Sequence, residues 1–223
     1  MNDRKTAFRM PLVMLVIVTF SCGAETKMMT HRHHSFENMD FYVKNFENPG
    51  RLEWQKPDEV VRAMKLGNGD IVADIGAGTG YFTRRIARAV APKGMVTGYD
   101  TEEKMVAYMR EDARKLGYAN YRAEHVPPIN PPLPKNHFDV IFMCNTYHHI
   151  EDRGSYLISM KPALKKSGRF VLIDHRLEAK DGPPKRFRIP KDIIVTEFGK
   201  AGFVSAKDLD FLPDQHYLEF TLR

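Results

Sequence analysis

The sequence predicts an α/β protein built on a doubly wound, mostly parallel sheet that is closed by a C-terminal antiparallel hairpin. Three observations support this fold class. Apolar, strand-like segments alternate with helical segments, a glycine-rich turn joins the first strand to a helix, and the last two strand-like segments follow each other directly. Strands that alternate with helices of about 10–15 residues are typical of parallel sheets with helices on both faces.

The first strand is expected at 70–75, where β-branched and apolar residues predict a buried central strand. Gly76, Gly78 and Gly80 follow it, and a helix is expected at 81–90. Glycines have no Cβ, so the chain can turn tightly there and come close to a ligand. The free amide groups and the positive dipole end of the helix would face that ligand.

The remaining elements continue the alternation. Further strands are expected at 95–100, 120–126, 138–145 and 168–174, and helices at 58–66, 102–116, 155–164 and 190–201. Strand-like segments at 205–212 and 216–222 lie so close together that no crossover helix fits between them. These two strands must therefore run antiparallel.

The composition is that of one folded globular domain. Of the 223 residues, 43% are hydrophobic and 28% are charged, which is enough apolar surface for one core. The net charge of +6 comes from basic residues that are scattered without interleaved aromatic residues, so no nucleic-acid partner is indicated. The two cysteines, Cys22 and Cys144, are too few for a disulfide framework.

The first residues have the pattern of an export signal. Basic residues precede an uncharged apolar run at 10–20 and small residues follow it, which predicts a secretory signal peptide at 1–21. The run is shorter than the roughly 20 residues that a membrane-spanning helix needs. Because a small residue precedes Cys22, the segment also resembles a bacterial lipoprotein signal, in which the cysteine is acylated. We therefore expect an exported, membrane-anchored lipoprotein facing the periplasm, with a cytoplasmic protein as the alternative.

Residues 22–53 are expected to form a tether and an N-terminal cap segment, and residues 54–223 the main domain. Aromatic residues of the cap segment, such as Phe41 and Phe46, are expected to pack on the domain or to cover the ligand cleft. Three histidines lie at 31–34 without acidic or cysteine partners at ligand spacing, so no metal site is predicted.

The spacing of the glycines narrows the ligand. A dinucleotide site has the pattern Gly-x-Gly-x-x-Gly, which places a helix N-terminus against a pyrophosphate. Here the third glycine comes one residue early, and Asp74 precedes Gly76 by two positions. A carboxylate at the strand end repels a pyrophosphate but attracts an amino group. S-adenosylmethionine has such a group and no phosphate; an NAD(P)-dependent oxidoreductase and a turn without a ligand are the less favoured alternatives.

The segment Asp74-Ile-Gly-Ala-Gly-Thr-Gly80 resembles motif I of the class I S-adenosylmethionine-dependent methyltransferases, and the resemblance extends from about Trp54 to Arg223. It implies a Rossmann-like, seven-stranded sheet with strand order 3-2-1-4-5-7-6, S-adenosylmethionine as cofactor, and methyl transfer to a small-molecule acceptor. The chain looks similar to a bacterial group of exported or lipid-anchored members. The expected cofactor-binding residues are Asp74, Gly76, Ala77, Gly78, Gly80, Asp100, Thr101, Met105 and Asn145.

Asp100 ends the second strand, 20 residues after Gly80, the distance at which an acidic residue meets ribose hydroxyls. The alternative is that it caps the helix at 102–116. The resemblance places Thr101 and Met105 beside the adenine. Many family members carry an acidic residue after the third strand, but this stretch is proline-rich and uncharged here, so no side chain is assigned to the adenine amino group.

The loop after the fourth strand reads Asn145-Thr-Tyr147-His148-His149. In the family this loop lies between cofactor and acceptor, and in amino-group methyltransferases it often reads Asn/Asp-Pro-Pro-Tyr/Phe, which this chain lacks. Tyr147 or His148 is the candidate that takes a proton from the acceptor, because a neutral histidine is a competent base at pH 7. The alternatives are that these side chains only shape the cleft, and that the protein is a non-catalytic envelope lipoprotein that keeps the fold.

Overall fold

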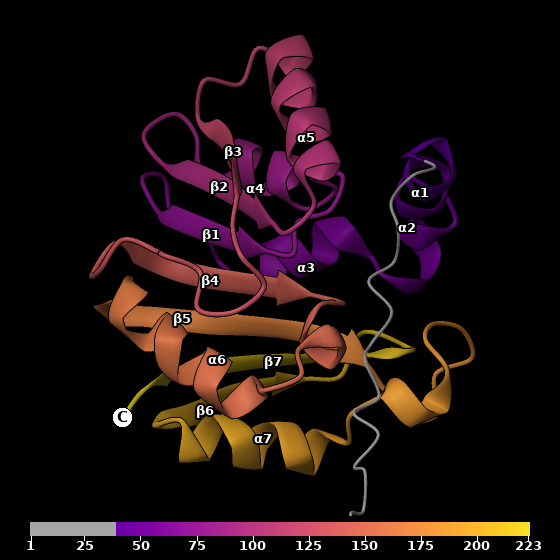
Figure 1. Cartoon of the computed structure of the whole chain (residues 1–223), viewed down its shortest axis with the longest axis vertical. Helices are drawn as coiled ribbons and strands as arrows, with labels where there is room; N and C mark the ends of the chain where they lie inside the picture. Colours follow the sequence, from indigo (N-terminus) through magenta and orange to yellow (C-terminus); the bar gives the residue numbers. More distant parts are fainter. Residues whose placement is uncertain (1–38) are drawn as a thin grey trace, which may run out of the picture. The chain divides into compact units, whose positions relative to one another are not determined.

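The computed structural model describes residues 39–223 and contains a seven-stranded sheet with strand order β3-β2-β1-β4-β5-β7-β6 (Figure 1). The strands are β1 (Ile71–Ile75), β2 (Met95–Asp100), β3 (Tyr121–His125), β4 (Phe138–Cys144), β5 (Leu164–His175), β6 (Phe203–Leu209) and β7 (Gln215–Leu222). The helices are α1 (Met39–Phe46), α2 (Arg51–Trp54), α3 (Pro57–Ala63), α4 (Thr83–Val90), α5 (Glu103–Leu116), α6 (Arg153–Met160) and α7 (Lys191–Lys200), with 3₁₀ turns η1 (Tyr147–His149), η2 (Lys161–Ala163) and η3 (Lys185–Phe187). The expected fold class and strand order are confirmed.

Three predictions concern residues before this range. The signal peptide at 1–21, the acylated Cys22 and the histidine tract at 31–34 lie outside the described residues. Within 39–223, no helix has the length and apolar character needed to cross a membrane.

The centre of the sheet is buried on both faces. β1 pairs in parallel with both β2 and β4. In β4, Val140 and Phe142 face a core shared with α3 and α4, whereas Ile141 and Met143 face a core shared with α6 and α7. Successive side chains of a strand point to opposite faces, so a strand covered on both sides is apolar at every position. This is why β4 is a continuous apolar run from Val140 to Cys144.

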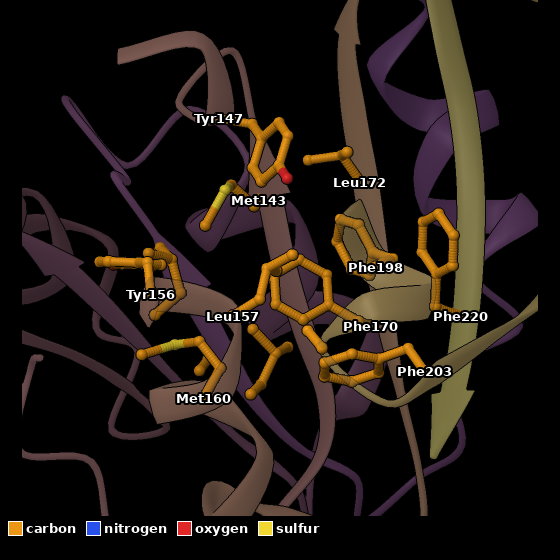
Figure 2. Close-up of a cluster of buried hydrophobic side chains, with 14 of the residues drawn as sticks. Met143, Tyr147, Tyr156, Leu157, Met160, Phe170, Leu172, Phe198, Phe203 and Phe220 are labelled. Atoms are coloured by element: carbon orange, nitrogen blue, oxygen red, sulfur yellow. The ribbon is translucent and has the colours of Figure 1, made fainter. Parts of the chain in front are cut away.

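The core beneath α6 and α7 is rich in aromatic side chains (Figure 2). Phe198 of α7 stacks on Phe220 of β7, with 3.8 Å between ring centroids, and meets Phe170 of β5 and Phe203 of β6 edge-on. All four rings are buried. Stacked and edge-on pairs are the favourable arrangements of aromatic rings, so this cluster fastens α7 to the closing hairpin.

The C-terminal strands close the sheet as predicted. β7 lies between β5 and β6 and pairs antiparallel with both. β6 ends at Leu209 rather than at 212, because Leu212 turns into the core and its carbonyl accepts a hydrogen bond from Arg176. β5 begins at Leu164, where the end of a helix was expected, because Pro162 lies in η2 and cannot continue the hydrogen bonding of α6.

Residues 39–54 contain the helices α1 and α2 and belong to the same compact unit as the sheet. The sequence predicted a tether and cap here. In Figure 1, α1 and α2 lie at the side toward which the arrowheads of β4 and β5 point. The Glu47 carboxylate, just after α1, forms an ion pair with Arg84 at 2.7 Å and accepts a hydrogen bond from the Thr79 hydroxyl. These contacts fix the cap segment to the glycine turn.

Candidate functional site

A cavity of about 350 Å³ opens at the carboxyl ends of β1 and β4, and residues of the glycine turn and of the α1–α2 segment line it. Open α/β sheets bind ligands at this edge, where the strand order reverses. The lining consists of Asn45, Phe46, Arg51, Trp54, Asp74, Gly76, Ala77, Gly78, Thr79, Tyr81, Phe82, Cys144, Asn145, His148, His149, His175 and Pro183. The volume falls within the range of small-molecule sites, about 300–1,000 Å³.

The three glycines of the turn all have positive φ angles, of +69° at Gly76, +56° at Gly78 and +77° at Gly80. A Cβ at Gly76 would lie 2.2 Å from the Thr146 hydroxyl oxygen, and one at Gly80 would lie 1.8 Å from that of Tyr121. Two of the glycines are therefore required by the protein's own packing as well as by the backbone angle. Gly78 faces Phe46 across the cavity side of the turn.

Asp74 supplies a buried carboxylate to the cavity. Its exposed fraction is 2%, and the Thr83 hydroxyl donates a hydrogen bond of 2.7 Å to Oδ2. Burial and the nearby Asp100 carboxylate together raise the pKa of Asp74 to about 7, against the lowering effect of the Thr83 hydrogen bond, and no cation within 39–223 contributes. A buried carboxylate without a cationic partner is a favourable site for a positively charged ligand group.

Asp100 holds the turn from outside the cavity lining. Its Oδ2 accepts a hydrogen bond of 2.7 Å from the Gly78 amide, and its Oδ1 accepts one of 3.0 Å from the amide of Glu102, the residue before α5. Burial raises the pKa of Asp100 as well. The carboxylate therefore makes the capping-type contact that was the alternative to ribose binding, and it also ties the turn to the start of α5.

Arg51 brings a positive charge to the lining. Its guanidinium lies 3.8 Å from the ring centroid of Tyr81, and Nε donates a hydrogen bond of 2.7 Å to the Gln55 side chain. The Tyr81 hydroxyl is buried and has no hydrogen-bond partner among the described residues. Neither residue was predicted as part of the site, because nothing in the sequence around Arg51 distinguishes it from a surface arginine.

Asn145 follows β4 in a left-handed conformation, with a φ of +57°. Gln215 donates a side-chain hydrogen bond to its Oδ1, and Gln55 donates to both Gln215, at 3.2 Å, and the Cys144 sulfur, at 3.2 Å. This buried chain of amides ties the cap segment, the end of β4 and the start of β7 to one another. Asn145 lines the cavity and is held in place by these amide hydrogen bonds.

His148 forms a dyad with Asp174. The Asp174 carboxylate, at the end of β5, contacts His148 Nδ1 at 2.7 Å and accepts a hydrogen bond of 3.1 Å from the His148 amide. Both side chains are 4% exposed. A carboxylate at Nδ1 keeps the proton on that nitrogen, which leaves the lone pair on Nε2. His148 lines the cavity, so the dyad is the arrangement of a general base.

Four other predicted site residues lie outside the lining. The hydroxyl of Tyr147 donates a hydrogen bond of 2.7 Å to Glu197 of α7, and its ring lies in the aromatic cluster of Figure 2. Met105 is buried within α5, Thr101 is exposed, and Gly80 packs on Tyr121. The structure therefore separates Tyr147 from the cavity that its neighbour His148 lines.

Trp54 and His175 were not predicted. Their rings lie with centroids 6.0 Å apart, and the His175 ring is 6.2 Å from that of His148. His175 ends β5, one residue after Asp174, and it continues the end-of-strand pattern that led to Asp74 and Asp100. The same rule, applied to the fifth strand, would have found this residue.

The fold and the cavity define an α/β enzyme that binds a nucleoside cofactor bearing an amino acid. Asp74 can hold its ammonium group, Arg51 can hold its carboxylate, and the turn at Gly78 lines the same cavity. No residue of the lining offers a basic cluster for a pyrophosphate.

Comparison with known proteins agrees with this class. Residues 66–192 match the family described as a methyltransferase domain, and the chain belongs to that family. It is an S-adenosylmethionine-dependent methyltransferase. The predicted family, enzyme class and cofactor are confirmed, and the dinucleotide alternative is set aside.

Three similar proteins illustrate the match. A solved structure of a SAM-dependent methyltransferase from Aquifex aeolicus is 27% identical, covers 81% of this chain and 97% of its own, and superposes with a TM-score of 0.77. Demethylmenaquinone methyltransferase of Listeria welshimeri is 26% identical over 163 residues, which are 73% of this chain and 68% of that protein. The ubiquinone/menaquinone biosynthesis C-methyltransferase of Shewanella sediminis is 27% identical over 158 residues, 66% of this chain and 62% of that protein.

Proposed function

We propose that the protein transfers the methyl group of S-adenosylmethionine to a small-molecule acceptor bound beside His148, and that His148 removes a proton from that acceptor. The observation that carries this proposal is the His148–Asp174 dyad in the lining of the cavity that also holds Asp74. When bound, the cofactor supplies a methyl group activated by a sulfonium. The residues of the chain therefore contribute mainly orientation and proton removal.

The cofactor is proposed to lie with its amino acid end near Asp74 and Arg51. The Gly78 turn would then support the nucleoside. Asp100 accepts a hydrogen bond from the Gly78 amide beside the cavity lining rather than within it, and from there it would meet the ribose hydroxyls. Thr101 and Met105 keep their proposed place beside the adenine only through the family resemblance, since both lie outside the cavity lining.

A small-molecule acceptor is supported by the kind of site and by the relatives. The cavity is a partly aromatic space of about 350 Å³, and the two relatives above are named as methyltransferases of demethylmenaquinone and of ubiquinone/menaquinone biosynthesis. Sites of this volume and lining are typical of small ligands.

Replacement of His148 tests the proposed base. We expect His148→Ala to lower turnover by roughly 10²–10⁴-fold while calorimetry shows unchanged affinity for S-adenosylmethionine. Asp174→Asn should lower turnover less, by roughly tenfold or more, because the imidazole remains but loses the group that orients it. His137→Ala, outside the cavity lining, is the matched control.

The readout is transfer of a labelled methyl group into the small-molecule fraction of a host extract. Label found only in protein or nucleic acid would contradict the acceptor class. Wild-type turnover in His148→Ala would remove the base from the mechanism. The same assay decides the alternative of a non-catalytic envelope protein, which transfers no label.

We also propose that the chain is exported and acylated at Cys22. The support is the leader alone, with its basic start, short apolar run and small residue before the cysteine. Fractionation of the host combined with fatty-acid labelling tests this, and Cys22→Ser should abolish the label. An unlabelled protein recovered with the cytoplasm would contradict it.

A further inference from the structure

A second cavity, of about 110 Å³, shares the side chains of Trp54 and His175 with the first. Asp181, Gly182 and Asp214 complete its lining, and we call it the outer cavity. Trp54 and His175 therefore lie between the two cavities, and a ligand in the first would have to extend past these rings to reach the second. None of the roles described so far uses the outer cavity.

His175 has a buried, unpaired nitrogen in the wall of the outer cavity, beside Gly182. The residue is 5% exposed, and its Nδ1 has no hydrogen-bond partner among the described residues. Burial lowers the pKa of His175 to about 4, so the imidazole is neutral at pH 7, with one ring nitrogen as a donor and the other as an acceptor. A buried polar atom without a partner is unfavourable, and a ligand group beside it would supply the missing hydrogen bond.

The wall of the outer cavity is fixed rather than loosely placed. Gly182 has a φ of +120°, and a Cβ there would lie 2.5 Å from His175 Nδ1, so only glycine allows this close packing. Asp214 holds the loop that leads from β5 to Gly182. Its Oδ1 accepts a hydrogen bond of 3.1 Å from the Lys180 amide, and its carbonyl accepts one of 3.0 Å from the Arg176 amide.

The charged side chains of the outer cavity's lining are all negative. Asp181 and Asp214 contribute carboxylates, and no lysine or arginine is part of the lining. The neighbouring arginines are engaged elsewhere: Arg176 forms an ion pair with Asp210. The guanidinium of Arg188 donates to the carbonyls of Leu177, Ala179 and Pro183.

We propose that the outer cavity binds an ammonium group of the methyl acceptor, at a position separate from the atom that is methylated. The two carboxylates attract the charge, the Trp54 ring offers a cation–π contact, and a ring nitrogen of His175 accepts an N–H. The ring centroids of His148 and His175 are 6.2 Å apart, so a short chain joins the ammonium group to the reacting atom. This inference rests on the proposed function, because it places the acceptor beside His148.

Trp54 is the single tryptophan of the chain, so its indole N–H gives one assignable NMR signal, which reports on both cavities that this residue lines. The full chain is titrated with n-butylammonium and, at matched ionic strength, with n-butanol, which has the same apolar tail without the charge. We expect a saturable shift of the indole signal with butylammonium, and at least tenfold weaker binding of butanol. Equal binding of the two compounds would overturn the proposal.

Charge-removing variants locate the site. In Asp181→Asn/Asp214→Asn, butylammonium should bind at least tenfold more weakly, because both carboxylates are lost while the amide oxygen at 214 can still accept from Lys180. Asp208→Asn removes an exposed carboxylate that pairs with Lys191, and it should bind butylammonium as the wild type does. Unchanged binding in the double variant would contradict the assignment.

Calorimetry with S-adenosylmethionine on the same samples separates the two proposals. Cofactor binding without any effect of butylammonium on the indole signal would overturn the ammonium site and leave the proposed function standing. Failure of the cofactor to bind a folded wild-type protein would overturn the proposed function, whatever the amine does. We expect the double variant to bind the cofactor as tightly as the wild type.

Discussion

Asp74 combines two opposing demands. Burial favours its neutral form and raises its pKa to about 7, whereas an ammonium ligand favours its charged form. In the unfolded chain the group titrates near its ordinary value of 3.8. Below pH 3.8 the group is protonated in both the folded and the unfolded state. As the pH rises toward 7, the unfolded chain loses this proton first, so the free energy of unfolding falls. Above pH 7 the ligand-free protein carries an unfavourable buried charge that cofactor binding relieves.

Replacement of Asp74 by asparagine separates these demands. We expect Asp74→Asn to bind S-adenosylmethionine about 10–100-fold more weakly, because a charge-assisted hydrogen bond is lost. The same change should raise the melting temperature of the ligand-free protein at pH 8 by about 2–8 °C, as expected for relief of ~1–2 kcal/mol. Calorimetry and thermal unfolding provide the two measurements.

The pH dependence gives the control for this prediction. Wild-type affinity for the cofactor should rise between pH 5.5 and pH 7 as Asp74 ionises, and the affinity of Asp74→Asn should stay flat over that range. A variant that keeps the wild-type affinity or the wild-type pH slope would show that Asp74 does not hold the ammonium group.

Individual site residues were predictable where chain position decides their place. Asp74 lies near the end of β1 and His148 follows β4, and parallel strands bring their carboxyl ends to one edge. Arg51 reaches the same cavity because the cap segment packs beside it, and no local sequence pattern predicts that packing. Tyr147 was predicted as a site residue because it adjoins His148, but the η1 turn directs its ring into the core beneath α7.

At the scale of elements, the turn after β1 depends on packing as much as on backbone angle. Gly76 and Gly117 have nearly equal φ angles, +69° and +68°, but a Cβ at Gly76 meets Thr146 whereas one at Gly117 meets nothing within 4 Å. Gly117→Ala should therefore cost only the backbone strain, about 1 kcal/mol of the free energy of unfolding. Gly76→Ala should cost clearly more.

Urea unfolding of the two variants measures this difference. A Gly76→Ala/Thr146→Gly double variant should regain part of the loss, because the clashing side chain is gone. Equal costs at the two positions would mean that the turn relaxes freely and that Thr146 does not confine it.

The cap segment should govern how long the cofactor stays bound. Glu47 joins this segment to the glycine turn through Arg84 and Thr79, and Phe46 beside it lines the cavity. We expect Glu47→Gln to speed cofactor dissociation several-fold, since the charged contact is lost while the cavity lining is intact. Glu53→Gln, on the exposed side of α2, is the control. Stopped-flow displacement measures the rate, and equal rates in both variants would contradict a covering role.

Element types were more predictable than element ends. The apolar runs and glycine stops predicted every strand of the sheet, because burial on both faces leaves a strong signal. The helices α1 and α2 were missed, since both are short and have no buried residue of their own. Their positions depend on Glu47, Arg51 and Gln55, whose partners lie far away in the chain.

For the whole molecule, the strand order followed from the family resemblance and the closing hairpin from the length of its connection. What the sequence could not show is that α7 joins the hairpin to the rest of the sheet. Phe198 contacts rings from β5, β6 and β7, so a single side chain links three strands that are distant in sequence. The C-terminal strands should therefore unfold together with the parallel strands.

Truncation of that side chain tests this cooperativity. Phe198→Ala should lower the free energy of unfolding by about 3–5 kcal/mol, because a fully buried ring is removed and leaves a cavity. Ile193→Ala, at a position of the same helix that is 41% exposed, should change it by less than about 1 kcal/mol. Urea unfolding followed by both circular dichroism and Trp54 fluorescence should give one coincident transition in each variant. A separate early transition in Phe198→Ala would show that the hairpin unfolds independently of the sheet that carries the site.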